Sequence, residues 1–150
     1  MLPSQHRRVA ARLQQIVSEP PPHVPRLLSY GLADHVLRLE FERIEGLSLH
    51  ALNSHLEQSD TRLKARLRYC FAQVLNDWNR NGFVHGDLSP RNILLDTRTG
   101  MGVWCIDWIV DLQSYECTPR YASLEVLKGL RSTQSDRHAF DTILKSWGHG

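Results

Sequence analysis

Apolar residues recur at helical spacing in two long segments of the chain. The first covers residues 4–19 and ends at three consecutive prolines. The second covers residues 61–81 and carries a broad apolar stripe, formed by Leu63, Leu67, Cys70, Phe71, Val74, Leu75 and Trp78. Side chains three and four positions apart share one face of a helix, so both segments are predicted to be amphipathic α-helices. Gly82 is a favourable signal for the end of the second helix, and a shorter helix is predicted over residues 49–56.

Strand patterns occur in two pairs of segments. Residues 23–31 and 35–41 are predicted to be strands. In the second of these, apolar residues alternate with polar ones at Leu37, Leu39 and Phe41. Residues 93–95 and 103–106 are two further apolar runs, joined by a loop dense in turn-forming residues, which predicts a β-hairpin. The helices and strands together predict an α+β fold.

Composition narrows the classes of protein to consider. With 150 residues and 41% hydrophobic content, the chain is expected to fold as one domain with a buried core. The net charge is only +2 and the arginines are spread along the chain, so nucleic acid is not expected as a partner. No apolar run is long enough to cross a membrane, so no membrane partner is expected.

The three cysteines, Cys70, Cys105 and Cys117, form no C-x-x-C pair. This pattern favours buried free thiols in a reducing compartment over a disulfide framework or a zinc site. A cytoplasmic location is therefore expected, with secretion into a host cell left open.

Oxygen-bearing side chains flank the predicted hairpin. Asp87 and Asn92 precede its first strand, and Asp107 follows its second strand. Because paired strands bring their flanking residues together, these side chains are expected at one end of the hairpin. Carboxylate and amide oxygens are the ligands that Mg²⁺ prefers, usually together with substrate phosphates. A surface loop whose carboxylates merely cap turns is the less favoured interpretation.

The motif around these residues resembles a known superfamily. HGDLSPRNILLD followed by CIDW is similar to the catalytic loop and the metal-binding strand end of protein-kinase-like proteins, of the serine/threonine protein kinase type. The run from Thr118 to Glu125 resembles the T-P-x-Y-x-x-P-E segment of these kinases, with Leu124 in place of the proline. Residues 135–144 resemble the start of the central C-lobe helix. The resemblance covers roughly residues 5 to 145.

The resemblance implies a protein-kinase-like fold with a mainly helical C-lobe and a reduced N-lobe. The single domain, residues 1–150, would then consist of a residual N-lobe and hinge in residues 1–45 and a C-lobe core in residues 46–150. Residues 42–49 resemble the hinge between the two lobes, with an ordinary turn as the alternative.

The same resemblance implies roles in phosphoryl transfer with ATP and Mg²⁺ as cofactors. Asp87 would orient the acceptor hydroxyl and take its proton, while Asn92 and Asp107 would bind the metal. Arg91 could reach the phosphate charge, although a solvated loop arginine is an equal alternative. The adenine would contact the hinge residues and the first strand of the hairpin, at Phe41, Glu42, Ile44 and Leu94.

Further residues are implied to support the site. His85 would be packed and hydrogen-bonded beneath the loop rather than act as a titrating base. Asp136 would hold the backbone of the catalytic loop, and Thr118 and Glu125 would belong to the segment that closes it. Gly86 stands where many regulated kinases have an arginine that pairs with a phosphorylated segment, so no dependence on such phosphorylation is expected.

The sequence departs from the family pattern at its N-terminal side. A glycine-rich loop and a strand lysine would normally cover the ATP phosphates. Here the first lysine is Lys64, and Gly31 is the only glycine before Gly46. Trp108-Ile109 also replaces the usual F-G pair. These features suggest a minimal or N-terminally truncated form.

The resulting hypothesis is ATP- and Mg-dependent phosphoryl transfer to serine or threonine hydroxyls of a protein substrate. A pseudokinase-like binding module without catalysis is one alternative, favoured by the missing glycine-rich loop. A small-molecule phosphotransferase of the aminoglycoside or sugar type is another, favoured by the HGD motif and Ser89 but not by the Thr118 to Glu125 run. The sequence leaves the oligomeric state open.

Overall fold

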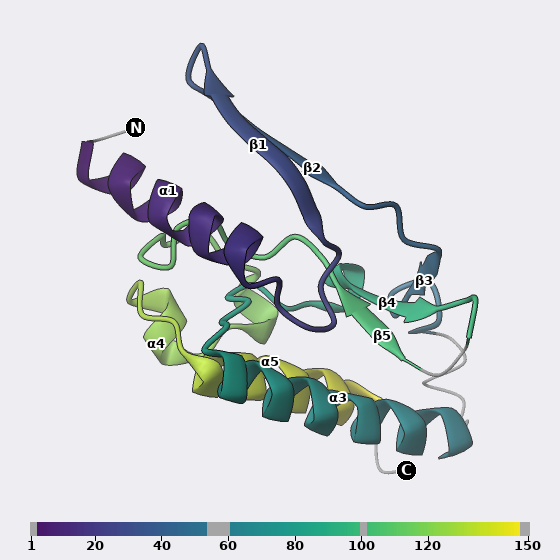
Figure 1. Cartoon of the computed structure of the whole chain (residues 1–150). Helices are drawn as coiled ribbons and strands as arrows, with labels where there is room; N and C mark the ends of the chain where they lie inside the picture. Colours follow the sequence, from purple (N-terminus) through teal and green to yellow (C-terminus); the bar gives the residue numbers. More distant parts are fainter. Residues whose placement is uncertain (1–2, 54–60, 100–101, 148–150) are drawn as a thin grey trace.

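Two small antiparallel sheets and a group of α-helices form the part of the chain that the computed structural model describes, residues 3–53, 61–99 and 102–147 (Figure 1). The elements in chain order are α1 (Pro3–Ser18), β1 (Leu27–Ala33), β2 (Val36–Phe41), β3 (Gly46–Ser48), α3 (Thr61–Asn81), η1 (Pro90–Asn92), β4 (Ile93–Asp96), β5 (Val103–Cys105), η2 (Pro119–Tyr121), α4 (Leu124–Leu127) and α5 (Thr133–Ser146), where η1 and η2 are short 3-10 helices. The predicted α+β class is confirmed, and α1 and α3 lie within one residue of their predicted bounds.

The N-terminal helix α1 lies beside a hairpin made of β1 and β2. The two strands are antiparallel, with Tyr30 opposite Leu39 and Leu32 opposite Leu37. Alternate residues of β2 are half-buried, as its sequence pattern predicted. Figure 1 shows the hairpin extending away from α3 and α5, with α1 along one side. A cavity of about 150 Å³ separates the helix from the strands.

The second sheet has the strand order β3-β4-β5. The predicted hairpin is confirmed, with Ile93 opposite Cys105 and Leu95 opposite Val103. Strand β3 was not predicted, because its three residues lie inside the segment interpreted as a hinge. At Gly46 the strands approach closely, since a Cβ atom there would lie 2.8 Å from Cβ of Leu94. The absence of a side chain at this position therefore permits the pairing.

The helix predicted over residues 49–56 lies only partly within the described residues. Hydrogen-bonded turns occupy residues 49–52, where the main-chain N–H of Leu52 donates to Ser48 and Leu49. Residues 54–60 are outside the described part of the chain.

Apolar contacts join α3 to α5, which run side by side in Figure 1. The rings of Phe71 and Phe140 lie 4.3 Å apart between centroids. Lys64 is also buried in α3, where its Nζ donates to the main-chain oxygen of Trp147 at 2.8 Å. The helix ends at Gly82, whose φ of 69° is the left-handed conformation that glycine adopts at little cost. This turn delivers the chain to the loop that carries Asp87.

The cysteines are all free, with Cys70 and Cys105 buried and Cys117 half-buried. In the described ranges, no helix combines the length and the apolar character needed to cross a bilayer.

Candidate active site

A buried carboxylate holds the loop of residues 83–92 through hydrogen bonds to its main chain. Asp136 of α5 is only 1% exposed, and its two oxygens accept hydrogen bonds from the main-chain N–H groups of His85, at 2.8 Å, and Gly86, at 3.0 Å. Burial raises the pKa of Asp136 to about 6, against the opposing effect of these two donors and of the cations Arg12 and Arg131. Asp136 thus holds the main chain of the loop at His85 and Gly86.

His85 lies fully buried beneath the same loop. Its Nε2 lies 2.6 Å from the main-chain oxygen of Ile106, and its Nδ1 accepts from the main-chain N–H of Asp87 at 3.1 Å. These partners require a neutral ring with the proton on Nε2. Burial lowers the pKa of His85 to about 3, with a smaller effect from the nearby charge of Arg12. A ring held neutral and engaged at both nitrogens can neither act as a base nor bind a metal without breaking these contacts.

Asp87, in the same loop, is half-buried. Its Oδ1 accepts two hydrogen bonds from Thr118, one from the main-chain N–H and one from the hydroxyl, each at 3.0 Å. Burial raises the pKa of Asp87, and the charge of Asp107 adds to this, while Thr118 acts in the opposite direction. The second carboxylate oxygen can therefore accept a proton while the first is held in place.

Asp107 is exposed and borders a cavity of about 230 Å³. The other residues that line this cavity are Pro25, Phe41, Glu42, Ile44, Ile106 and Trp108. The structure therefore brings three of the four predicted adenine contacts to the same cavity as a predicted metal ligand. Leu94 is not among the lining residues, because its side chain lies against Gly46 in the neighbouring strand.

The chemistry of the oxygen donors at this end of the hairpin fits Mg²⁺. Nδ2 of Asn92 donates to the main-chain oxygen of Asp87 at 2.9 Å, which leaves the amide oxygen as the atom available to a cation. The main-chain oxygen of Asn92 accepts from Ile106, next to Asp107, at 2.8 Å. One carboxylate and one amide oxygen are hard ligands of the kind that Mg²⁺ combines with water and phosphate oxygens. Within the described residues, no group of three His, Cys, Asp or Glu side chains forms an all-protein metal site.

Asp87 and Asn92 do not line this cavity, and Asp87 lines another pocket together with Thr118 and Asp136. The two remaining predicted residues, Arg91 and Glu125, also lie outside the cavity. Arg91 is exposed in η1, between Asp87 and Asn92, and is not a lining residue. Glu125 is exposed in α4, and its main-chain oxygen accepts from the N–H of Leu130 at 2.8 Å. The structure therefore gives neither side chain a contact with the cavity.

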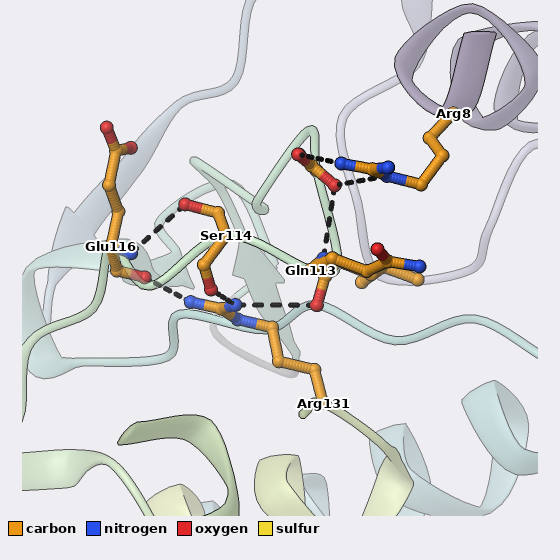
Figure 2. A network of polar contacts seen from close by, with 7 residues as sticks. Arg8, Gln113, Ser114, Glu116 and Arg131 are labelled. Carbon is orange, nitrogen blue, oxygen red and sulfur yellow. Dashed lines mark hydrogen bonds and ion pairs between the residues drawn. The ribbon is translucent and has the colours of Figure 1, made fainter. Parts of the chain in front are cut away.

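Sequence reasoning missed an arginine that holds the segment between Asp107 and Thr118. Figure 2 shows Arg131 pointing at the main chain of this segment, where it donates to the oxygens of Leu112, Ser114 and Glu116. Its Nε also donates to the main-chain oxygen of Gly86 at 2.9 Å. A Cβ atom on Gly86 would overlap Ile109 and lie 2.8 Å from Cδ of Arg131. The glycine in HGD is thus the one sequence signal of this contact, because it leaves room for the arginine.

A second arginine reaches the same segment from α1. Arg8 donates to both carboxylate oxygens of Asp111, at 3.3 and 3.2 Å, and Asp111 also accepts from the main-chain N–H of Gln113 (Figure 2). The segment is therefore held on two sides by arginine side chains.

A comparison with known protein families finds a match. The family model described as RIO domain matches residues 10–127, well over half of the chain. The matched stretch includes Asp87, Asn92 and Asp107 and ends before α5. No curated protein sequence matches the chain.

Proposed function

This chain belongs to the RIO domain family of atypical protein-kinase-like proteins, and on that basis we propose that it transfers phosphate from ATP to serine or threonine hydroxyls of a protein substrate. The observation that carries the proposal is the shared cavity of Asp107 and the residues Phe41, Glu42 and Ile44. A carboxylate at the mouth of an apolar cavity suits a nucleotide, whose base is apolar on its faces and whose phosphates require a cation.

The base would lie between apolar side chains and the main chain of residues 42–44. The N–H of Glu42 already donates to the main-chain oxygen of Arg26 at 2.9 Å, and the Glu42 carboxylate accepts from the N–H of Arg26 at 2.8 Å. Because the N–H of Glu42 is engaged, we assign the carbonyl of Glu42 and the N–H of Ile44 to the adenine edge. The proposal therefore assigns one acceptor and one donor to the base.

Asn92 and Asp107 would hold Mg²⁺, which neutralises charge on the phosphates when it is bound. Asp87 would orient the attacking hydroxyl through the carboxylate oxygen that Thr118 does not engage, and would take its proton. A carboxylate with a raised pKa is a better proton acceptor than an ordinary exposed one. Thr118 would keep the carboxylate at a fixed angle while this occurs.

One observation favours a second candidate, a nucleotide-binding module without catalysis. The cavity lining contains two carboxylates, those of Glu42 and Asp107, and no cationic side chain. Lys64 cannot supply the charge, because its Nζ is buried against Trp147 at the far end of α3 and α5. Arg91, beside Asn92, is the side chain that we assign to the phosphate charge under the catalytic proposal.

The test measures Mg-dependent ATP binding and phosphate transfer to a generic protein substrate and to small polyols and aminoglycosides. The variants are Asp87→Asn and Asp107→Asn, with Asp141→Asn as the matched control because Asp141 is an exposed aspartate of α5. Loss of a positioned base or of a metal ligand should reduce transfer at least about a hundredfold, while the control stays at the wild-type rate.

The alternatives give different results in this experiment. Transfer that survives both substitutions contradicts the catalytic assignment. Binding of ATP without transfer by the wild-type protein identifies the binding module, and transfer to small polyols or aminoglycosides but not to protein identifies a small-molecule phosphotransferase.

A further inference from the structure

Arg12 of α1 connects the two segments that carry Asp87 and Asp107. Its guanidinium donates to the main-chain oxygen of Val84 at 2.7 Å through Nη2 and to that of Ile109 at 2.7 Å through Nε. Val84 lies just before His85 and Gly86 in the loop, and Ile109 lies two residues after Asp107. One planar cation therefore bridges both chain segments from the side of α1.

The same guanidinium lies over two aromatic rings. Its central carbon is 5.4 Å from the ring centre of Phe83 and 5.2 Å from that of Trp108. Trp108 is only 5% exposed, and its ring also makes a T-shaped contact with Phe41, the cavity residue at the end of β2, at 5.9 Å between ring centres. Burial lowers the pKa of Arg12 to about 10, so the group stays charged at neutral pH. The cation thus ties α1 to a ring that lines the cavity.

Asp107 has a backbone conformation that needs support from its neighbours. Its φ is 55°, in the left-handed region, which costs a residue other than glycine about 1 kcal/mol or more. On its N-terminal side, Ile106 is held through its main-chain N–H and oxygen by Asn92 and His85. On its C-terminal side, Arg12 holds the ring of Trp108 and the carbonyl of Ile109. The turn at Asp107 is therefore supported on both sides, and Arg12 supplies the support on its C-terminal side.

We infer that Arg12 is a positioning residue for the metal and nucleotide site: it fixes the turn at Asp107 against the 83–92 loop, so that the docking of α1 sets the affinity for Mg²⁺ with nucleotide. This inference rests on the proposed function, in which Asp107 is a metal ligand. Under this inference Arg12 does not contact the substrate. The affinity for Mg²⁺ is set by the docking of α1 rather than by phosphorylation of the 107–118 segment.

The test uses Arg12→Lys, because lysine keeps the charge and the apolar stem but cannot bridge two carbonyls and cover two rings at once. The measured quantity is the Mg²⁺ concentration that half-saturates binding of a fluorescent ATP analogue to the full chain. Loss of a residue that orients a ligand typically weakens metal binding by about tenfold or more, and we expect that here. Transfer at saturating Mg²⁺ should return to within about twofold of the wild type, since Asp87 keeps its contacts with Thr118 and its loop stays held by Asp136. Arg7→Lys is the matched control, because Arg7 is an exposed arginine of the same helix.

A second variant separates positioning from folding. Trp108→Phe keeps an apolar ring but weakens the contact with the cation, since tryptophan is the best of the aromatic partners. It also removes the Nε1–H of Trp108, a buried donor without a hydrogen-bond partner in the described structure, so the fold is not expected to lose a polar contact. We expect a higher half-saturating Mg²⁺ concentration in this variant. The smaller ring lowers the thermal unfolding midpoint, and cooperative unfolding above the assay temperature shows that the variant is folded.

The outcomes distinguish the inference from the function on which it rests. If the wild-type protein binds the analogue but both folded variants bind it with unchanged Mg²⁺ dependence, the positioning role is overturned alone. If Arg12→Lys does not fold, Trp108→Phe decides by the same measure. If the wild-type protein shows no Mg-dependent binding, the proposed function is overturned and the inference with it.

Discussion

Asp87 and Thr118, 31 residues apart in the chain, meet through a single carboxylate oxygen that accepts both the main-chain N–H and the hydroxyl of Thr118. The contact fixes the rotation of the Asp87 side chain and leaves its second oxygen for another partner. It also joins the end of the 107–118 segment to the 83–92 loop. Arg131 and Arg8 hold the segment, and Asp136 holds the loop. The geometry of Asp87 is thus determined by residues from three parts of the chain.

Thr118→Val should reduce phosphate transfer about tenfold, because a hydrogen bond to a charged acceptor contributes about 1.5 kcal/mol or more. Since Thr118 opposes the effect of burial on Asp87, its removal should raise the pKa of Asp87 further and move the acid limb of the pH–rate profile to higher pH. Thr118→Ser keeps the hydroxyl and serves as the control. An unchanged acid limb in Thr118→Val would show that the hydroxyl has no influence on the titration of Asp87.

Gly86→Ala should lower the free energy of unfolding by about 2 to 4 kcal/mol. The φ of Gly86 is 91°, and an added Cβ atom would overlap Ile109 and press on Arg131. Gly31→Ala is the control, since a Cβ atom there meets nothing within 4 Å and no left-handed φ is required. Both values come from chemical denaturation, and equal values for the two variants would contradict the crowding at Gly86.

Asp136→Asn should destabilise the protein by about 1 to 3 kcal/mol at neutral pH. The amide retains one oxygen, so one of the two N–H groups of His85 and Gly86 would lose its acceptor in a buried position. Asp141→Asn, an exposed substitution in the same helix, should have little effect. The measurement is again the free energy of unfolding.

The destabilisation by Asp136→Asn should also depend on pH. The pKa of Asp136 is about 6 in the folded protein and near 3.8 when the chain is unfolded, so between these values the folded wild type binds one more proton than the unfolded chain. Its stability through this group therefore rises as pH falls, by about 1.4 kcal/mol per pH unit, and the variant lacks this gain. The difference in unfolding free energy should widen from about pH 6 to about pH 4, and a constant difference would contradict the raised pKa.

The titration of His85 changes the unfolding free energy in the opposite direction, in the wild type and in the variant. Its pKa is about 3 when folded against 6.5 as an ordinary value, so the unfolded chain binds more protons between these values and stability is lost as pH falls. In the wild type, the changes of unfolding free energy with pH that are due to Asp136 and to His85 nearly cancel between about pH 4 and pH 6. In Asp136→Asn only the change due to His85 remains, so this variant loses more stability than the wild type as pH falls.

The sequence predicted those features whose cause is local. The spacing of apolar residues gave α1 and α3 within one residue, and the turn-rich loop gave the pairing of β4 with β5. Strand β3 was not predicted, because three residues are too few to show an alternating pattern. Their extended conformation depends on pairing with β4, which lies far along the chain. Lys64 is a similar case, since its burial depends on the carbonyl of Trp147 in the neighbouring helix.

The candidate site divides in the same way. The sequence by itself determined which groups are the candidates for the chemistry, because the order and spacing of Asp87, Asn92 and Asp107 place them at the two ends of one hairpin sequence. Only the tertiary structure decided how they are held, through Arg12, Arg131 and Thr118, and that Leu94 lies outside the cavity. The physical reason is that each of these arginines acts on main-chain oxygens, which every residue carries. A contact with a carbonyl oxygen seldom constrains which residue carries that oxygen. Gly86 is the exception, because the approach of Arg131 requires a glycine there, and the other contacts are revealed only by the folded chain.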